Sequence, residues 1–185
     1  MLLSGCGVQR VIENNRSENS SSTADRNSGT STSDAPETSA ASEEAEVAGY
    51  NVGDTAQLGD WEITVNSVEA VDSIQNTYGA FKPDEGNKYI AVNVTAKNLG
   101  TEKSTFLPTY GFSGTIGAKI IYGEYEFSGT NLLGYDDDLH DTSLNPLSSK
   151  TGIMAFSVAE EVAENLSELH LVFSEKGSDC DFSLQ

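Results

Sequence analysis

The stretch KYIAVNVTAKN, residues 88–98, decides the fold class of this chain. Apolar side chains occupy every second position in it, at Ile90, Val92, Val94 and Ala96. Successive side chains of a β-strand point to opposite faces, so this spacing places the four on one face. A mixed face of Tyr, Ala, Asn, Thr and Lys is left on the other side, and the turn signal Asn-Leu-Gly follows at residues 98–100. The stretch therefore predicts a strand that ends in a turn.

The same alternation is found upstream, beyond an expected loop at residues 73–87. A turn is expected at residues 51–54, and residues 61–65 then alternate apolar with polar side chains, which predicts a half-buried strand. Val68 and Val71 break the phase of this alternation. The break predicts a bulge or a bend within the strand.

Downstream of residue 100 the strand-like segments are short and separated by turn signals. They are expected at residues 106–112, at 116–127 as a pair around Gly123, and at 153–158, 169–173 and 180–184. Pro108 favours an edge strand or a strand end for the first of them. The four-residue spacing of Val158, Val162 and Leu166 predicts one or two helical turns. Seven to nine short strands within residues 49–185 predict an all-β fold, an antiparallel immunoglobulin-like β-sandwich.

The charge of the chain excludes some classes of partner. The 185 residues include 29 acidic and 10 basic side chains, which gives a formal net charge of −19. Such an excess repels polyanions, so we expect no nucleic-acid partner and no direct docking on anionic headgroups. The sequence also lacks an apolar run of about 18 residues, the minimum for a membrane-spanning helix.

The first six residues suggest a lipid anchor. Leu3-Ser4-Gly5-Cys6 matches a bacterial lipobox, in which the cysteine receives a diacylglyceryl group. Two acyl chains are what stable anchoring needs, at about 0.8 kcal/mol per buried methylene. A secretory signal also needs an apolar stretch of about 7–15 residues before its cleavage site. We therefore expect residues 1–6 to be the remnant of a longer signal peptide, and Cys6 to be lipidated.

Residues 7–48 have the composition of a tether. Ser, Thr, Asn, Asp and Glu dominate, aromatic residues are absent, and 3 arginines stand against 8 acidic residues. Such a composition cannot bury enough apolar surface to offset the entropy of the chain. We expect a disordered acidic segment, with a root-mean-square reach of about 35 Å if it behaves as a flexible coil.

The order of these segments resembles that of a known family. The resemblance rests on VGDT (52–55), LGDWEITV (58–65), GNKYIAVNV (86–94), KNLG (97–100), Pro146, TGIMAF (151–156) and LHLVF (169–173). These segments resemble the Gram-positive lipoprotein domain of unknown function of type 4352, a family with a telokin-like, immunoglobulin-like sandwich. The family's usual glycine after the proline is Leu147 here. The resemblance implies a lipid-anchored protein on the extracellular face of a Gram-positive membrane, and it brings no catalytic or binding residues with it.

The acidic loop at residues 132–146 is the first candidate for chemistry. Asp136, Asp138 and Asp141, together with Asp137, could converge on Ca²⁺, which binds several carboxylate and carbonyl oxygens. The spacing is not that of an EF-hand loop, and no glycine or glutamate completes it. A solvated loop in an acidic chain is the alternative, so calcium is the one cofactor that the sequence suggests.

The two histidines and the second cysteine provide little for catalysis. His140 lies beside Asp141 and could be oriented by it, but no nucleophile in a Gly-x-Ser-x-Gly turn accompanies the pair. His170 falls on the outward face of its strand, and we expect both to be surface histidines. Cys180 is flanked by carboxylates that would raise its pKa, so we expect a buried, unreactive thiol. The sequence predicts no enzyme.

The loop around Tyr78 and Phe81 is the remaining candidate. Its rings could contact a partner, as amphipathic aromatics do in interfaces, or they could cap the end of the sandwich. Taken together, the sequence predicts an anchored extracellular protein that presents a binding or adaptor domain to an unknown protein or wall component. The alternative is a Ca²⁺-binding surface protein that uses the acidic loop.

Overall fold

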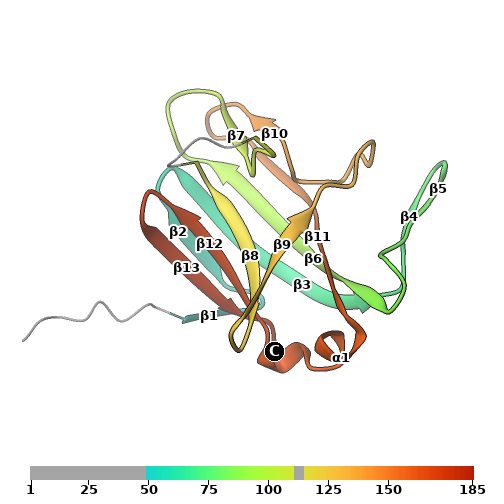
Figure 1. The fold of residues 1–185 in the computed structure, drawn as a ribbon. Helices are drawn as coiled ribbons and strands as arrows, with labels where there is room; N and C mark the ends of the chain where they lie inside the picture. Colours follow the sequence, from blue (N-terminus) through green and yellow to red (C-terminus); the bar gives the residue numbers. More distant parts are fainter. Residues whose placement is uncertain (1–48, 111–114) are drawn as a thin grey trace, which may run out of the picture. The chain divides into compact units, whose positions relative to one another are not determined.

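The computed structural model describes residues 49–110 and 115–185, so the lipobox, Cys6 and the expected tether lie outside the described residues. Nine of the described strands form one continuous sheet (Figure 1). In sheet order they are β1 (Gly49–Asn51), β13 (Ser178–Ser183), β12 (His170–Glu175), β8 (Gly117–Tyr122), β9 (Tyr125–Thr130), β11 (Ser149–Ala159), β6 (Asn87–Asn98), β3 (Trp61–Val71) and β2 (Thr55–Leu58).

This sheet folds over on itself at β9 and so forms the two layers of a β-sandwich. The first part of β9 pairs with β8, whereas Gly129 and Thr130 pair with β11 in the other layer. The sheet nearly closes on the opposite side, where the thiol of Cys180 on β13 lies 3.7 Å from the carbonyl oxygen of Gln57 on β2. The predicted all-β sandwich is therefore confirmed.

The stretch at residues 88–98 forms the middle of the second layer, as β6. Its predicted apolar face is completely buried, with 0% exposure at Ile90, Val92, Val94 and Ala96. It pairs antiparallel with β11 on one side and with β3 on the other. The register with β3 shifts between Val65 and Ser67, so the predicted break in that strand is confirmed as a bulge.

The core between the layers contains aliphatic side chains of both sheets and a chain of aromatic rings. Phe106 and Phe173 have centroids 6.2 Å apart, and Phe173 and Phe182 have centroids 5.9 Å apart. Trp61 packs edge-on against Phe106 at 5.0 Å. These rings all lie on predicted strand positions, which explains why the alternating pattern was informative.

Several expectations about individual segments need correction. The expected strand at residues 106–112 ends early, because β7 spans only Ser104–Phe106 and Leu107 has a positive φ of 45°. The expected loop at 132–146 contains the short strand β10 (Thr142–Leu144), which pairs with β7. Strand β1 pairs in parallel with β13, so the sheet is not purely antiparallel.

The helical turns are confirmed as α1 (Glu160–Ala163) and the 3₁₀ turn η1 (Leu166–Glu168).

The expected loop at residues 73–87 contains a hairpin of two short strands, β4 (Ile74–Asn76) and β5 (Gly79–Phe81) (Figure 1). A second apolar cluster, separate from the main core, holds its base. The buried members of this cluster are Ile74, Tyr89, Ala91, Leu132 and Ala155. The hairpin is thus fastened to the outer side of the second layer, and its turn lies furthest from that base.

Candidate functional site

The acidic loop follows β9 and is bound closely to the sheet. Its most buried acidic residue is Asp138, which is 7% exposed and forms a parallel bridge with Ile153 of β11. The Asp138 carboxylate accepts three hydrogen bonds, from the backbone N–H of Leu132 at 2.7 Å, the backbone N–H of His140 at 3.0 Å and the His140 ring Nδ1 at 2.8 Å. All three donors belong to the same loop, so Asp138 acts as an internal brace.

The electrostatics of Asp138 agree with this structural role. Burial alone would raise the pKa of its carboxyl, but the hydrogen bonds from the His140 side chain and from the backbones of His140 and Leu132 lower it below its usual value. Hydrogen bonds to the charged form of a carboxylate stabilise that form. Asp138 is therefore ionised at neutral pH, and its oxygens are occupied by donors of the loop.

The other two proposed calcium ligands face different partners. Asp141 accepts hydrogen bonds from the Thr109 backbone N–H at 2.8 Å and the Thr109 hydroxyl at 2.6 Å, and these bonds lower its pKa. Asp136 is exposed, and its backbone carbonyl accepts a hydrogen bond from Lys150 Nζ at 2.9 Å. Lys150 also donates to the Asp138 carbonyl at 3.1 Å.

The loop borders an open hollow of about 510 Å³. Asp136, Asp138, Asp141 and Lys150 all contribute to its lining, but the three carboxylates do not converge on a common point there. Among the described residues, no group of three or more His, Cys, Asp or Glu side chains is arranged to hold a metal ion. The structure therefore gives the calcium hypothesis no support.

The histidines differ in their surroundings. His140 is not a surface residue, since its side chain is only 12% exposed, and its carboxylate partner is Asp138 rather than the adjacent Asp141. The reason is that Asp141 adopts a left-handed backbone conformation, with φ at 55°, and bonds to Thr109. His170 is exposed as predicted and pairs with Asp181 across β12 and β13 at 2.8 Å.

Cys180 is buried, with 5% exposure, as the sequence predicted. Burial raises the pKa of its thiol, and the charge of Asp179 raises it further. A thiol with a raised pKa forms little thiolate and is a poor nucleophile at neutral pH.

Tyr78 and Phe81 of the β4–β5 hairpin, which the sequence placed in one candidate binding loop, differ in their exposure. Tyr78 lies in the turn between β4 and β5 and is 95% exposed. Phe81 is half-buried and packs edge-on against Tyr135, with centroids 6.1 Å apart, so it stabilises the hairpin and is not free for a partner. Of the two residues, only Tyr78 is exposed, and its contact with a partner stays a prediction.

A residue that the sequence did not single out lies in the loop bonded to this hairpin. Leu133 is 87% exposed, and it adjoins Gly134, whose carbonyl accepts a hydrogen bond from Asn76 Nδ2 at 3.4 Å. We refer to the hairpin turn with Tyr78 and the adjoining loop with Leu133 as the apolar tip. The leucines of this loop follow no strand or helix period, so no pattern in the sequence distinguishes the exposed Leu133 from the buried Leu132.

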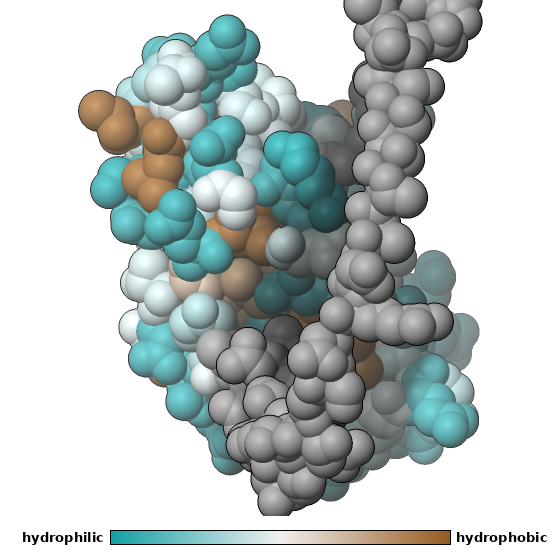
Figure 2. Space-filling model, turned by 90° about the vertical axis from the view of Figure 1, so that its left-hand side faces the viewer, coloured by the Kyte–Doolittle hydropathy of each residue, from teal (hydrophilic) through white to brown (hydrophobic). Residues whose placement is uncertain are grey.

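Where the face in Figure 2 is not covered by grey atoms, most of it is hydrophilic or intermediate, with apolar side chains at the upper left edge and near the centre. A group of exposed large apolar residues marks an interaction site, whereas a single one is normal on a protein surface. Within the described part of the chain, no helix is long and apolar enough to cross a bilayer.

The domain resembles known proteins in sequence. The model of the family described as a domain of unknown function (DUF4352) matches residues 50–178. The uncharacterized protein YxkC of Bacillus subtilis (strain 168) is 30% identical over 123 residues, which is 60% of this chain and 64% of that protein. The chain thus covers less than two thirds of this relative.

Two solved structures share the fold. An uncharacterized β-sandwich protein of Clostridium difficile 630 has a TM-score of 0.54 and 18% identity, over 77% of this chain and 99% of that chain. The yjhA protein of Bacillus subtilis has a TM-score of 0.50 and 16% identity, over 74% of this chain and 99% of that chain. At these identities the likeness shows the fold alone.

Proposed function

Because this chain belongs to the family of the domain of unknown function DUF4352, whose matched region is the β-sandwich itself, we propose that it is a lipid-anchored surface protein whose sandwich binds a partner and catalyses no reaction. The anchor is the lipidated Cys6, and residues 7–48 are the tether. The protein lies on the extracellular face of the membrane of a Gram-positive bacterium. The sequence motif Leu3-Ser4-Gly5-Cys6 supports this location.

One structural observation favours binding as the role of the sandwich. Tyr78 and Leu133 are 95% and 87% exposed at the apolar tip, whereas Asp138 and Asp141 of the acidic loop are engaged in internal hydrogen bonds. An exposed apolar side chain on a firmly held support is available to a partner, whereas a carboxylate whose donors come from its own fold is not. The apolar tip is therefore the proposed binding site.

The location is tested by fractionation of cells that express the gene with its upstream codons. The unsubstituted protein is expected in the membrane fraction, carrying metabolically incorporated labelled fatty acid. Cys6→Ala should move it to the medium without label. An unsubstituted protein that is already soluble and unlabelled would contradict the anchor.

The binding role is tested with a photo-crosslinking amino acid at Thr77, which is exposed next to Tyr78. In membranes that contain the full chain, irradiation should produce a discrete protein adduct, and Leu133→Ser should abolish it. The same crosslinker at Tyr125, which is 68% exposed at the start of β9, is the matched control and should yield none. Equal labelling from both positions would contradict a binding site at the tip.

A further inference from the structure

The end of the sandwich beneath the hairpin contains an unusual concentration of negative charge. It is formed by residues 69–88 and by the segment of α1 and η1 at 160–168, and it is extended by the loop at 133–137, which is bonded to the hairpin and to the middle of β11. These three segments contain ten exposed acidic residues and only two lysines. The acidic residues are Glu69, Asp72, Asp84, Glu85, Asp136, Asp137, Glu160, Glu161, Glu164 and Glu168. We refer to them as the acidic end.

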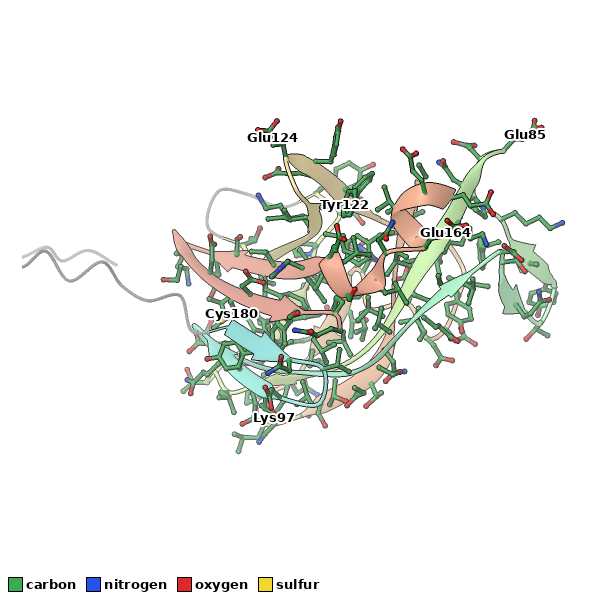
Figure 3. The ribbon with its side chains drawn as sticks, turned by 90° about the horizontal axis from the view of Figure 1, so that it is seen from below. Glu85, Lys97, Tyr122, Glu124, Glu164 and Cys180 are labelled. Atoms are coloured by element: carbon green, nitrogen blue, oxygen red, sulfur yellow. The ribbon has the colours of Figure 1, made fainter. Side chains whose placement is uncertain are left out.

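Contacts show that residues 69–88 and the segment of α1 form one surface, whereas Asp136 and Asp137 lie apart from α1, beside Lys150 and Ile153 of β11. Lys88 Nζ lies 3.7 Å from Asp72 and 3.2 Å from Glu160, so it joins the end of β3 to α1. The backbone N–H of Glu160 donates to the Gly86 carbonyl at 3.1 Å, which brings the turn at 84–86 to the same place. Figure 3 shows Glu85 and Glu164 on the side of the molecule that carries the hairpin.

The lysines neutralise little of this charge. Lys88 is paired with Glu160 and Asp72 of the same surface, and its hydrogen bond to Glu160 and the charges of Glu160 and Asp72 raise its pKa. The exposed Lys82 is the other cation of the three segments, and Lys150 of β11 lies against the loop at Asp136. Residues 49–185 contain 7 lysines, no arginine and 21 acidic residues, a formal charge of −14. The acidic end holds −8 of this, and contacts place Asp72, Glu160 and the turn at 84–86 together at the base of the hairpin.

We propose that the apolar tip and the acidic end together bind a basic protein, with Tyr78 and Leu133 in an apolar pocket of that partner and its lysines and arginines facing the acidic end. The proposal rests on the binding role proposed above and names its partner class. Charge complementarity carries it, because opposite potentials speed encounter and exclude partners of the wrong sign. Anionic membranes and anionic polymers are repelled by this surface.

The apolar and acidic parts would contribute differently. Tyr78 and Leu133 would supply the anchors, since truncation of a buried apolar anchor has a larger effect on affinity than removal of a charge at the rim. The acidic end would act mainly through the rate of association and its dependence on salt. Variants of the two parts therefore give separable results.

The experiment uses membranes that contain the full chain with the crosslinker at Thr77. The adduct is expected to decrease about fivefold or more between about 20 mM and about 300 mM NaCl, because salt screens surface charges. The variant Glu161→Gln/Glu164→Gln/Glu168→Gln should reduce the adduct to a similar extent at low salt. The control Glu102→Gln/Glu124→Gln/Asp179→Asn removes the same charge elsewhere and should leave it unchanged. Mass spectrometry of the adduct should identify a protein with a basic isoelectric point.

The outcomes separate this proposal from the binding role itself. An adduct that Leu133→Ser abolishes, but that neither salt nor the Gln variant reduces, would keep the binding site and overturn the basic partner. Equal loss in both charge variants would also overturn it, because net charge alone would then explain the effect. An adduct with lipid or with a second copy of this chain overturns the proposed partner class. The absence of any adduct overturns both proposals.

Discussion

Asp138 shows how a residue that looks like a ligand can be structural. Its carboxylate accepts hydrogen bonds from two backbone N–H groups and one imidazole. Replacement by Asn leaves at least one buried donor without a charged acceptor, so we expect Asp138→Asn to lower the free energy of unfolding by about 1.5–3 kcal/mol. Urea denaturation followed by tryptophan fluorescence measures this. Asp137→Asn, at the exposed neighbour, should change it by less than about 0.5 kcal/mol. Equal effects would show that the brace is unimportant.

The same carboxylate predicts a dependence of stability on pH. The pKa of Asp138 is lowered in the folded protein, so the unfolded chain takes up a proton at a higher pH than the folded one. The stabilisation is therefore complete above the unfolded pKa of about 3.9 and is lost as the pH falls through the lower folded value. The free energy of unfolding of wild type should fall more steeply with acidification below about pH 4 than that of Asp138→Asn. Parallel curves would contradict this assignment.

Leu147 occupies a position that a glycine would fit better. It has a φ of 61° in the turn closed by the hydrogen bond from Ser148 to Asn145, and its side chain is 73% exposed. The left-handed conformation costs a non-glycine residue about 1–2 kcal/mol, and a glycine removes this strain. Part of the gain is offset, because glycine also gives the unfolded chain more conformational freedom. We expect Leu147→Gly to raise the free energy of unfolding by about 0.5–1 kcal/mol. Leu147→Ala keeps the strain and should give no gain in the same denaturation assay.

At the scale of elements, the attachment of the acidic loop to β11 depends on Gly152. A Cβ atom at this position would overlap the Asp137 carbonyl oxygen and press on the Leu139 side chain. Gly152→Ala should therefore force the loop away from the strand and lower the free energy of unfolding by about 1–3 kcal/mol. Gly117→Ala on β8 is the control, because a Cβ there meets nothing within 4 Å. Hydrogen exchange of the Ile153 amide, which is bonded to Asp137, should increase only in the first variant.

The same contrast between buried strands and attached loops explains what could be predicted from the sequence. The apolar alternation on β6, β11 and β12 marks the face of each strand that is buried between the two layers. The sandwich could therefore be predicted from this pattern. The hairpin of β4 and β5 was missed because Gln75, Asn76 and Gly79 give no alternation. The expectation of a surface histidine at 140 was wrong, because sequence proximity to Asp141 reveals neither the positive φ of that residue nor the bond from His140 to Asp138. The exposure of Leu133 depends on where its loop is fastened, which no local pattern encodes.

At the scale of the whole molecule, the excess of negative charge sets a further expectation. The −14 of residues 49–185 repels itself in the compact state, and about half of it lies at the acidic end. Screening by salt weakens this repulsion over distances longer than the Debye length, about 10 Å at 0.1 M. The melting temperature should therefore rise as NaCl is added at low ionic strength, and the rise should level off at higher concentrations.

The location of the charge makes this expectation specific. The acidic-end variant Glu161→Gln/Glu164→Gln/Glu168→Gln removes repulsion where it is densest. It should therefore raise the melting temperature at low salt and make that temperature depend less on NaCl. Both effects should be larger than those of the control Glu102→Gln/Glu124→Gln/Asp179→Asn. Differential scanning calorimetry on the full chain measures both slopes. Such a result would mean that the acidic end lowers the stability of the folded protein. A surface that binds a partner of opposite charge is expected to have this effect. Identical slopes for the two variants would show that the charge is spread too evenly to mark any one surface.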